Sequence, residues 1–351
     1  MNFSSILYSS IFYPTLLIKH LWKYIFKFLF CLLLFIGCAN HDKLEVLEGY
    51  ALGTKYHVKY ASKTLNSEKT SNGLDSIFSV INNSMSTYLP SSLISRFNRD
   101  NTSLRVDEHF ETVFRVSEEI WTKTDGYFDP TVGPLVDAYG FGSDGYVPIN
   151  YEHLDSLKRF IGLDKVKLEN KVLTKQYAEV SLDFNAIAKG YAIDLIGLYF
   201  TNKKTDNFLI EIGGEVLVRG HNPESNKPWS IGIENPIVDS LPKILRVVEL
   251  KDKAQATSGN YRKFLIDSLT GEEYTHIVNP ITGELKPSNL LSVSVTANTC
   301  IKADALATAL MVMPIDKGKE LVANEDDVEA LWILSGEDNQ TILHQSTGFG
   351  K

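Results

Sequence analysis

Two polar residues stand one helical turn apart in an apolar segment near the end of the chain. Asp304 and Thr308 lie within ADALATAL (303–310), and positions i and i+4 share one face of a helix. A buried carboxylate is costly unless it is paired or bound to a cation, and Mg²⁺ takes hard oxygen ligands with only one or two carboxylates. The pair could therefore hold Mg²⁺, or Asp304 could cap its helix while Thr308 bonds back to the main chain.

A second apolar segment, DFNAIAKGYAID (183–194), carries a lysine and an aspartate at positions 189 and 194. Gly190 inside this helical pattern costs about 1 kcal/mol relative to Ala. That cost predicts a close approach of the backbone, either to another helix or to a ligand. The alternative is tight helix packing, with Lys189 reaching outward to solvent.

Two further stretches could also contact a ligand. The first, DGYFDPTVGP (125–134), is dense in turn formers and could lay an aromatic ring against a flat ligand, or be a rigid structural turn. In the second, Ser258-Gly259-Asn260 could offer backbone N–H groups to phosphate oxygens. Downstream, His276 stands in YTHIVNPITG (274–283), although a lone histidine is more often structural than catalytic.

Helices and strands that would position these residues alternate without regular βαβ order, which favours an α+β fold with antiparallel sheet. Residues 61–73 are polar, and 140–150 are a loop by Gly and Pro content. Apolar periodicity predicts helices over 74–81, 110–123, 185–200 and 304–313. Alternation predicts strands over 56–60, 208–212, 215–218, 231–234, 246–250 and 291–296, and a closing hairpin over 332–335 and 341–344.

The composition is that of an ordinary globular protein, with 44% hydrophobic and 22% charged residues among 351. The formal net charge is −8, and the body has no basic run, so we expect no nucleic-acid partner. No low-complexity linker divides residues 46–351, which we interpret as one domain.

Residues 1–37 have the layout of a secretory signal, with lysines before a short apolar run, FLFCLLLFI (28–36). The following Gly37-Cys38 resembles the end of a bacterial lipobox, so we expect Cys38 to be lipidated and 38–45 to be a tether. The alternative is an uncleaved anchor helix. Either way, we expect the body to lie outside the cytoplasm, in the cell envelope. Cys300 is then the one cysteine of the body, and we interpret it as a buried core residue.

Taken in order, these segments resemble the ApbE family of flavin transferases. The resemblance runs from Leu52-Gly53-Thr54 to Thr308, almost the whole body. The matching segments are MSTYLPSSLISRFN (85–98), TDGYFDPTVGPLV (124–136), GFG (140–142), DFNAIAKGYAID (183–194), EIGGEV (211–216), ATSGNYRKF (256–264), YTHIVNPITG (274–283) and ADALATAL (303–310).

The resemblance implies a single α+β domain related to the T-fold, with FAD as substrate and a dependence on Mg²⁺. It implies transfer of the FMN half of FAD to a threonine hydroxyl of another protein, while AMP leaves. The acceptors it implies are flavoprotein subunits of membrane redox complexes, which carry the flavin outside the cytoplasm. A lipid anchor is also common in this family.

The resemblance also assigns roles to individual residues. It places Asp304, Thr308 and a main-chain oxygen of Ala192 at the metal, and His276 as the group that assists proton removal from threonine. Departures from the family pattern are mild: Leu52 replaces a common Met, Asn279 a common Asp, and Lys189 a residue that is Glu in some members. The residues at FAD-contacting positions are Leu52, Tyr88, Tyr127, Phe128, Asp129, Lys189 and Ile277.

Two other functions remain open at this point. A FAD pyrophosphatase would keep the site but let water attack, giving FMN and AMP. A lipid-anchored FAD-binding protein without turnover would have no need for Asp304, Thr308 and His276, and their joint presence argues against it.

Overall fold

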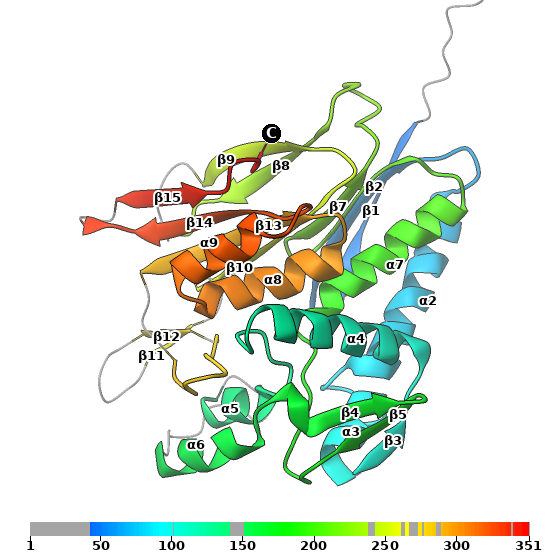
Figure 1. The fold of residues 1–351 in the computed structure, drawn as a ribbon. Helices are drawn as coiled ribbons and strands as arrows, with labels where there is room; N and C mark the ends of the chain where they lie inside the picture. The colour runs from blue at the N-terminus through cyan, green and yellow to red at the C-terminus, as the bar shows by residue number, and fades with distance from the viewer. Residues whose placement is uncertain are drawn as a thin grey trace, which may run out of the picture. The chain divides into compact units, whose positions relative to one another are not determined.

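The eight-stranded antiparallel sheet is the central element of the computed structural model (Figure 1). The structure describes residues 43–100, 102–140, 151–237, 243–260, 264–266, 273–275, 277–285, 289–337 and 340–350. All of these belong to one unit, Lys43–Lys351. In sheet order the strands are β1 (Leu44–Ala51), β2 (Thr54–Ala61), β6 (Asn207–Ile212), β7 (Glu215–Arg219), β10 (Ala254–Gly259), β13 (Leu290–Ala297), β14 (Glu329–Ser335) and β15 (Thr341–Gln345).

Helices cover one face of this sheet and a two-stranded hairpin covers the other. Alternate residues of a strand point to opposite faces, and β7 illustrates this: Leu217 belongs to the main core, whereas Val216 and Val218 belong to a second core. The main core packs under α2 (Ser67–Met85), α7 (Ala188–Asn202) and α8 (Cys300–Val312). The second core packs under β8 (Trp229–Glu234) and β9 (Ile244–Leu250).

Most of the remaining described elements lie beyond the ends of these helices, whereas α9 (Ile315–Ala323) lies beside α8 and β14 (Figure 1). A three-stranded sheet, β3-β5-β4, lies beside α3 and α4, and α5 and α6 enclose a small third core. Their bounds are α3 (Leu93–Asp100), β3 (Ser103–Arg105), α4 (Glu108–Lys123), α5 (Gly133–Ala138), α6 (Tyr151–Leu157), β4 (Val166–Glu169), β5 (Val172–Lys175), β11 (Phe264–Ile266) and β12 (Glu273–Thr275).

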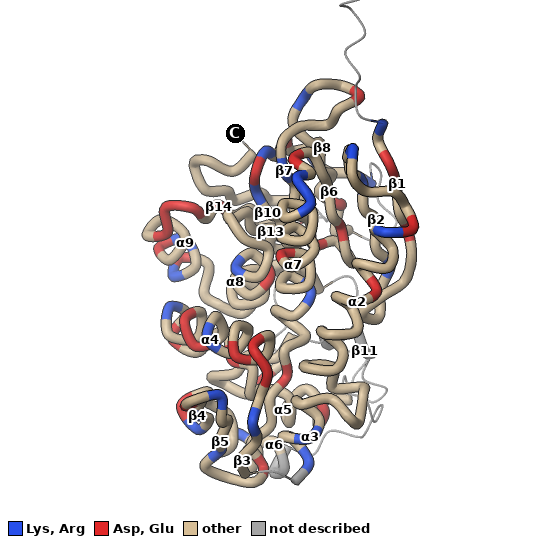
Figure 2. Tube along the Cα trace, turned by 90° about the vertical axis from the view of Figure 1, so that its right-hand side faces the viewer, with Lys and Arg blue, Asp and Glu red and all other residues tan. Residues whose placement is uncertain are grey.

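Acidic and basic residues are interspersed along α4 and α9 (Figure 2). Lys123 at the end of α4 and Lys302 in α8 each bind Glu325, at 2.8 and 2.7 Å, just after α9. Lys302 also lies 2.5 Å from Asp327. In the described ranges, no helix combines the length and apolar character needed to cross a membrane.

The α+β prediction is confirmed, but several elements start earlier than the sequence predicts. Helix α2 begins at Ser67, inside the stretch interpreted as polar, because the Asn66 side chain accepts a hydrogen bond from Lys69 N at 2.9 Å and caps the helix. Gly73 weakens the apolar pattern there, and the Tyr199 ring occupies the space beside it, 2.6 Å from where a Cβ would lie. Strand β1 begins at Leu44 and so takes the last two residues of the predicted tether.

Candidate active site

Helices α7 and α8 cap each other's first turns. Asp304, in α8, accepts a hydrogen bond from Gly190 N of α7 at 3.0 Å through its Oδ2. Asp194, in α7, accepts from Cys300 N at 2.8 Å and from Ile301 N at 2.9 Å, the first two residues of α8. Because the residues at the N-cap positions make no side-chain cap bond, these two carboxylates satisfy N–H groups that would otherwise lack partners.

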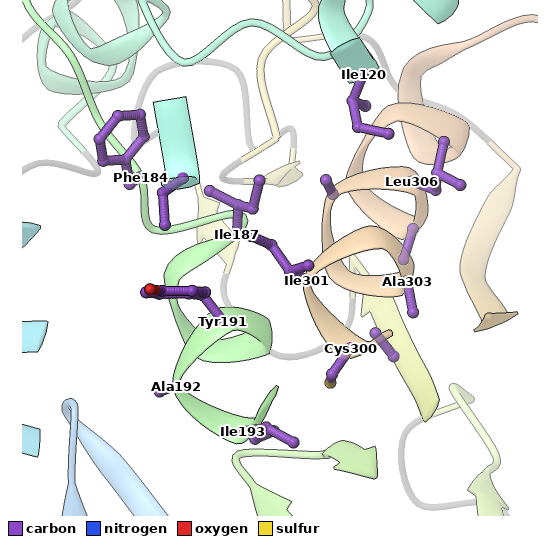
Figure 3. Packing of buried hydrophobic residues seen from close by; sticks show 14 of the residues in the cluster. Ile120, Phe184, Ile187, Tyr191, Ala192, Ile193, Cys300, Ile301, Ala303 and Leu306 are labelled. Atoms are coloured by element: carbon purple, nitrogen blue, oxygen red, sulfur yellow. The ribbon is translucent and has the colours of Figure 1, made fainter. Parts of the chain in front are cut away.

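Gly190 lets the two helices approach closely. A Cβ at this position would lie 2.5 Å from the Cys300 carbonyl oxygen and 2.8 Å from the Ile301 Cα. At the start of α7, the side chains of Ile187 and Ile301 lie together between the two helices (Figure 3). The close backbone approach predicted from the glycine is therefore confirmed, and the partner is another helix.

Three charged side chains gather beside this crossing. The Lys189 ammonium lies 3.4 Å from Glu215 Oε1 and 3.9 Å from Asp304 Oδ1. The side chains of Glu215 and Asp304 are only 6% and 5% exposed. Lys189 is thus an ion-pair partner of two buried carboxylates, and the alternative that it simply reaches out to solvent is wrong.

Burial and mutual charge perturb these groups. Burial raises the pKa of Asp304 to about 7, the nearby Glu215 carboxylate adds to that effect, and the Lys189 ammonium opposes it. For Lys189, burial alone would lower the pKa, but the two carboxylates outweigh it and raise the pKa, so the ammonium stays charged. Perturbed groups that gather in this way are common at functional sites.

Asp304 and Thr308 occupy the interior of α8, one turn apart, as their spacing predicts. Thr299 holds the N-cap position of α8, so the alternative that Asp304 is the N-cap of its own helix is wrong. The Thr308 hydroxyl lies 3.3 Å from the Ser258 hydroxyl of β10. Carboxylate and hydroxyl oxygens thus face the end of the sheet on one side of the helix.

The stretch around Ser258 forms a strand. Residues 254–259 form β10, where Ser258 pairs with Val293 and Gly259 with Ser292 of β13. Asn260 N then donates to Leu291 O at 2.9 Å. The Asn260 N–H is therefore committed to the ladder, whereas β7 pairs with β10 only at Ala254 and Gln255. A phosphate contact by the backbone at Gly259, on the side away from β13, stays a prediction.

Two tight turns bring further residues to this end of the sheet. Glu215 follows the Gly213-Gly214 turn, both glycines having positive φ, and Gly213 N donates to Lys55 O at 3.0 Å. The neighbouring β1–β2 turn contains Leu52, whose φ of 50° is rare for a leucine. A strained residue of this kind is a functional candidate, which agrees with the predicted FAD contact at Leu52.

The aromatic loop after α4 is built as a rigid turn around Asp129. The Asp129 carboxylate accepts hydrogen bonds from Trp121 Nε1 (2.9 Å), from Thr131 N and Oγ1 (2.8 and 2.6 Å) and from Leu163 N (3.2 Å). Phe128 is buried. Any FAD contact by these two residues would therefore have to use the main chain or the loop's shape rather than their side chains.

Tyr127 and Tyr88 have rings with accessible surface. Tyr127 is half-buried, with the Lys317 ammonium 5.9 Å from its ring centre. Tyr88, which follows α2, is 68% exposed. Ile277 is half-buried against the main core. These three residues remain predicted FAD contacts.

Ala192 does not fit the ligand set predicted for it. It lies in the second turn of α7, where a helical carbonyl points toward the C-terminal end and accepts the hydrogen bond of the next turn. Asp304 meets α7 at its N-terminal turn instead, and Figure 3 shows the Ala192 side chain on the side of α7 away from α8. The main-chain oxygen of Ala192 therefore does not lie beside the Asp304 carboxylate.

Two predicted residues, His276 and Cys38, lie outside the described residues.

The sequence did not indicate Glu215 as a site residue, nor the partners of Asp194. Glu215 lies in the segment EIGGEV, where the double glycine before a strand could have drawn attention to the acidic residue that follows. Asp194 was visible as a polar residue on an apolar helix, but its partners on α8 are 106 and 107 positions away. No local pattern reports a contact of that range.

The fold and this cluster define the class of protein: an α+β enzyme whose charged site lies where two helices cross the end of an antiparallel sheet. A profile of the ApbE family matches residues 52–332. The chain belongs to the ApbE family.

Relatives and solved structures agree over most of the chain. The "FAD:protein FMN transferase" of Vibrio cholerae serotype O1 is 35% identical, with 88% of this chain and 92% of the relative covered. The protein of the same name from Haemophilus influenzae is 33% identical, covering 90% and 93%.

Among solved structures, "Flavin Transferase ApbE from Vibrio cholerae" matches with a TM-score of 0.78 and 32% identity, over 88% of this chain and 98% of the other. The apo form of the Pseudomonas stutzeri flavinyl transferase ApbE matches with a TM-score of 0.78 and 29% identity, over 88% and 96%. These matches confirm the resemblance to the family and its single α+β fold.

Proposed function

We propose that this chain is an FAD:protein FMN transferase that attaches FMN to a threonine of an acceptor protein. The observation that carries the proposal is the likeness, over about nine-tenths of the chain, to relatives that bear this name. In the reaction, a threonine oxygen attacks the FMN-side phosphorus of FAD and forms a phosphoester. The bond between that phosphorus and the bridging oxygen breaks, AMP leaves with the bridging oxygen, and the hydroxyl proton passes to a base.

The residues present fit a Mg²⁺ ion. When both carboxylates are ionised, the negative charges of Glu215 and Asp304 exceed the positive charge of Lys189 by one in this buried place. Asp304 and Thr308 supply hard oxygens, the donors that Mg²⁺ prefers. No group of three or more His, Cys, Asp or Glu side chains suited to a metal occurs in the described ranges, and Mg²⁺ needs only one or two carboxylates.

We assign Asp304 and Thr308 to hold this ion, which would neutralise charge on the pyrophosphate oxygens and on the leaving AMP. Lys189 offers a fixed ammonium to the same oxygens, since its pKa is raised. Tyr88 offers an exposed ring for stacking on a flat group. His276 is the proposed proton acceptor, because a threonine hydroxyl is a poor nucleophile at neutral pH.

The cellular setting is proposed from the N-terminal sequence alone. The apolar run at 28–36 and Cys38 support a palmitate-bearing lipoprotein anchored to a membrane of the bacterial envelope, with its body outside the cytoplasm. Acceptors in that compartment would be flavoprotein subunits of membrane redox complexes, which become flavinylated after translation.

The test follows AMP and free FMN with the detergent-solubilised full-length chain, FAD and Mg²⁺, with and without an acceptor domain that carries the threonine. We expect AMP only when the acceptor is present, and no free FMN. Equal amounts of AMP and free FMN without the acceptor would make the chain a pyrophosphatase. Bound FAD without either product, across several acceptors, would leave a binding protein.

A further inference from the structure

The Glu215 carboxylate is buried but only half satisfied. Its Oε1 lies 3.4 Å from the Lys189 ammonium, and its side chain is 6% exposed. Its Oε2 is fully enclosed and has no hydrogen-bond partner among the described residues. Among the described residues, the Lys189 ammonium is therefore the partner that holds this buried carboxylate.

The backbone aims this carboxylate at α7. Glu215 is the first residue of β7, directly after the tight Gly213-Gly214 turn. Two residues later on the same face, Leu217 lies under α7, where a Cβ on Gly197 would meet its Cδ2 at 2.6 Å. Because strand side chains alternate, Glu215 must face α7 as well, and there it meets Lys189.

Lys189 lies between two carboxylates but closer to one of them. Its ammonium is 3.4 Å from Glu215 Oε1 and 3.9 Å from Asp304 Oδ1. Asp304 Oδ2 already accepts the hydrogen bond from Gly190 N. Oδ1 is therefore the Asp304 oxygen that a further ligand would use, and the ammonium stands too far from it to hydrogen-bond well.

We propose that Glu215 is a positioning residue that holds the Lys189 ammonium away from Asp304 Oδ1 and thereby keeps that oxygen available to a divalent cation. This inference rests on the proposed Mg²⁺-dependent function. Glu215 acts through Lys189 and does not itself bind the ion.

The effect of removing the Glu215 charge follows from electrostatics. Without it, Asp304 becomes the nearest anion to the ammonium, and the two would form a closer pair. A lysine paired directly to Asp304 occupies the oxygen that the cation needs and repels the cation at short range. Changing a residue that orients a metal ligand typically costs about 10–100-fold in metal affinity.

The experiment compares Glu215→Gln, which keeps the shape, with the wild type as full-length, detergent-solubilised chains. Calorimetric titration of each FAD-loaded protein with Mg²⁺ gives the affinity directly, without relying on turnover. We expect affinity to fall by about 10–100-fold, with a matching rise in the Mg²⁺ concentration that half-saturates AMP release. Glu249→Gln, an exposed residue of β9, is the matched control and should leave both values unchanged.

A double variant separates positioning from direct coordination. If Glu215 acts through Lys189, then adding Lys189→Met to Glu215→Gln removes the competing ammonium and returns the Mg²⁺ affinity to within a few-fold of that of Lys189→Met alone. A double variant as weak as Glu215→Gln would overturn the proposal in favour of Glu215 as a ligand.

Wild-type affinity in Glu215→Gln would overturn the proposal outright. In both of those cases the wild type still binds Mg²⁺ and transfers FMN, so the proposed function stands. A wild type that neither binds Mg²⁺ nor transfers FMN would instead refute the proposed function, and this inference with it.

Discussion

Replacing Gly190 by Ala tests whether the crossing of α7 and α8 holds the site together. The added Cβ would lie 2.5 Å from the Cys300 carbonyl oxygen, a main-chain atom that cannot rotate away. An ordinary van der Waals separation is about 3.5 Å, so the two helices would have to move apart by about 1 Å. That movement would stretch the hydrogen bond from Gly190 N to Asp304 Oδ2, now 3.0 Å.

The expected loss can be set against a control in the same helix. Gly197→Ala places its Cβ 2.6 Å from Leu217 Cδ2, the end of a flexible side chain that can turn aside. Both changes gain up to about 1 kcal/mol in helix propensity, but overpacking against fixed atoms costs about 1–3 kcal/mol. We therefore expect Gly190→Ala to be about 2 kcal/mol less stable than Gly197→Ala.

Urea denaturation followed by circular dichroism measures this difference, with both variants in the same background. We also expect Gly190→Ala to need more Mg²⁺ for AMP release, because Asp304 would lose its fixed position. If Gly190→Ala proves as stable as Gly197→Ala, the two helices can separate freely, and the close contact does not position the site.

Three other predictions concern the metal residue, the base and a surface ion-pair network. Asp304→Ala should abolish Mg²⁺-dependent AMP release, and unchanged release at saturating Mg²⁺ would remove Asp304 from the metal site. His276→Asn should still bind FAD, measured by flavin fluorescence, but slow transfer by about 10²–10⁴-fold; near wild-type transfer would exclude it as the base. Burial alone would raise the pKa values of Glu325 and Asp327. Hydrogen bonds from Lys123 and Lys302 lower the pKa of Glu325, and a hydrogen bond from Lys302 lowers that of Asp327. The stability from these pairs is therefore present above pH about 4–5 and lost as pH falls below it. The difference in unfolding free energy between the wild type and Lys302→Met should shrink over that range, and a constant difference would refute the assignment.

Periodicity predicted the elements whose apolar residues repeat clearly, and it failed where a contact distant in sequence sets a boundary. Helix α4 was predicted to within two residues because its apolar face is regular. Helix α8 starts at Cys300, four residues before its predicted start, because Asp194 of α7 caps it. Strand β10 was not among the predicted strands, because Thr257, Ser258 and Gly259 break the apolar alternation. The sheet overrides that local preference by pairing the segment with β13.

The candidate site was predictable only where its residues are close in sequence. Asp304 and Thr308 share a helix, so their spacing alone places them on one face. The partners of Lys189 could not be found in this way, since Glu215 and Asp304 reach it from a strand and a helix far along the chain. For Asp129, composition indicated a loop, but only the structure shows its carboxylate committed to four hydrogen bonds.

FMN transfer is tested most directly by the intact mass of an acceptor protein after incubation with the full-length chain, FAD and Mg²⁺. A parallel sample uses the acceptor with its target threonine replaced by alanine. We predict that the acceptor gains the mass of one phosphoester-linked FMN and that the alanine variant gains nothing. An unmodified acceptor, with FAD consumed to FMN and AMP, would contradict the account.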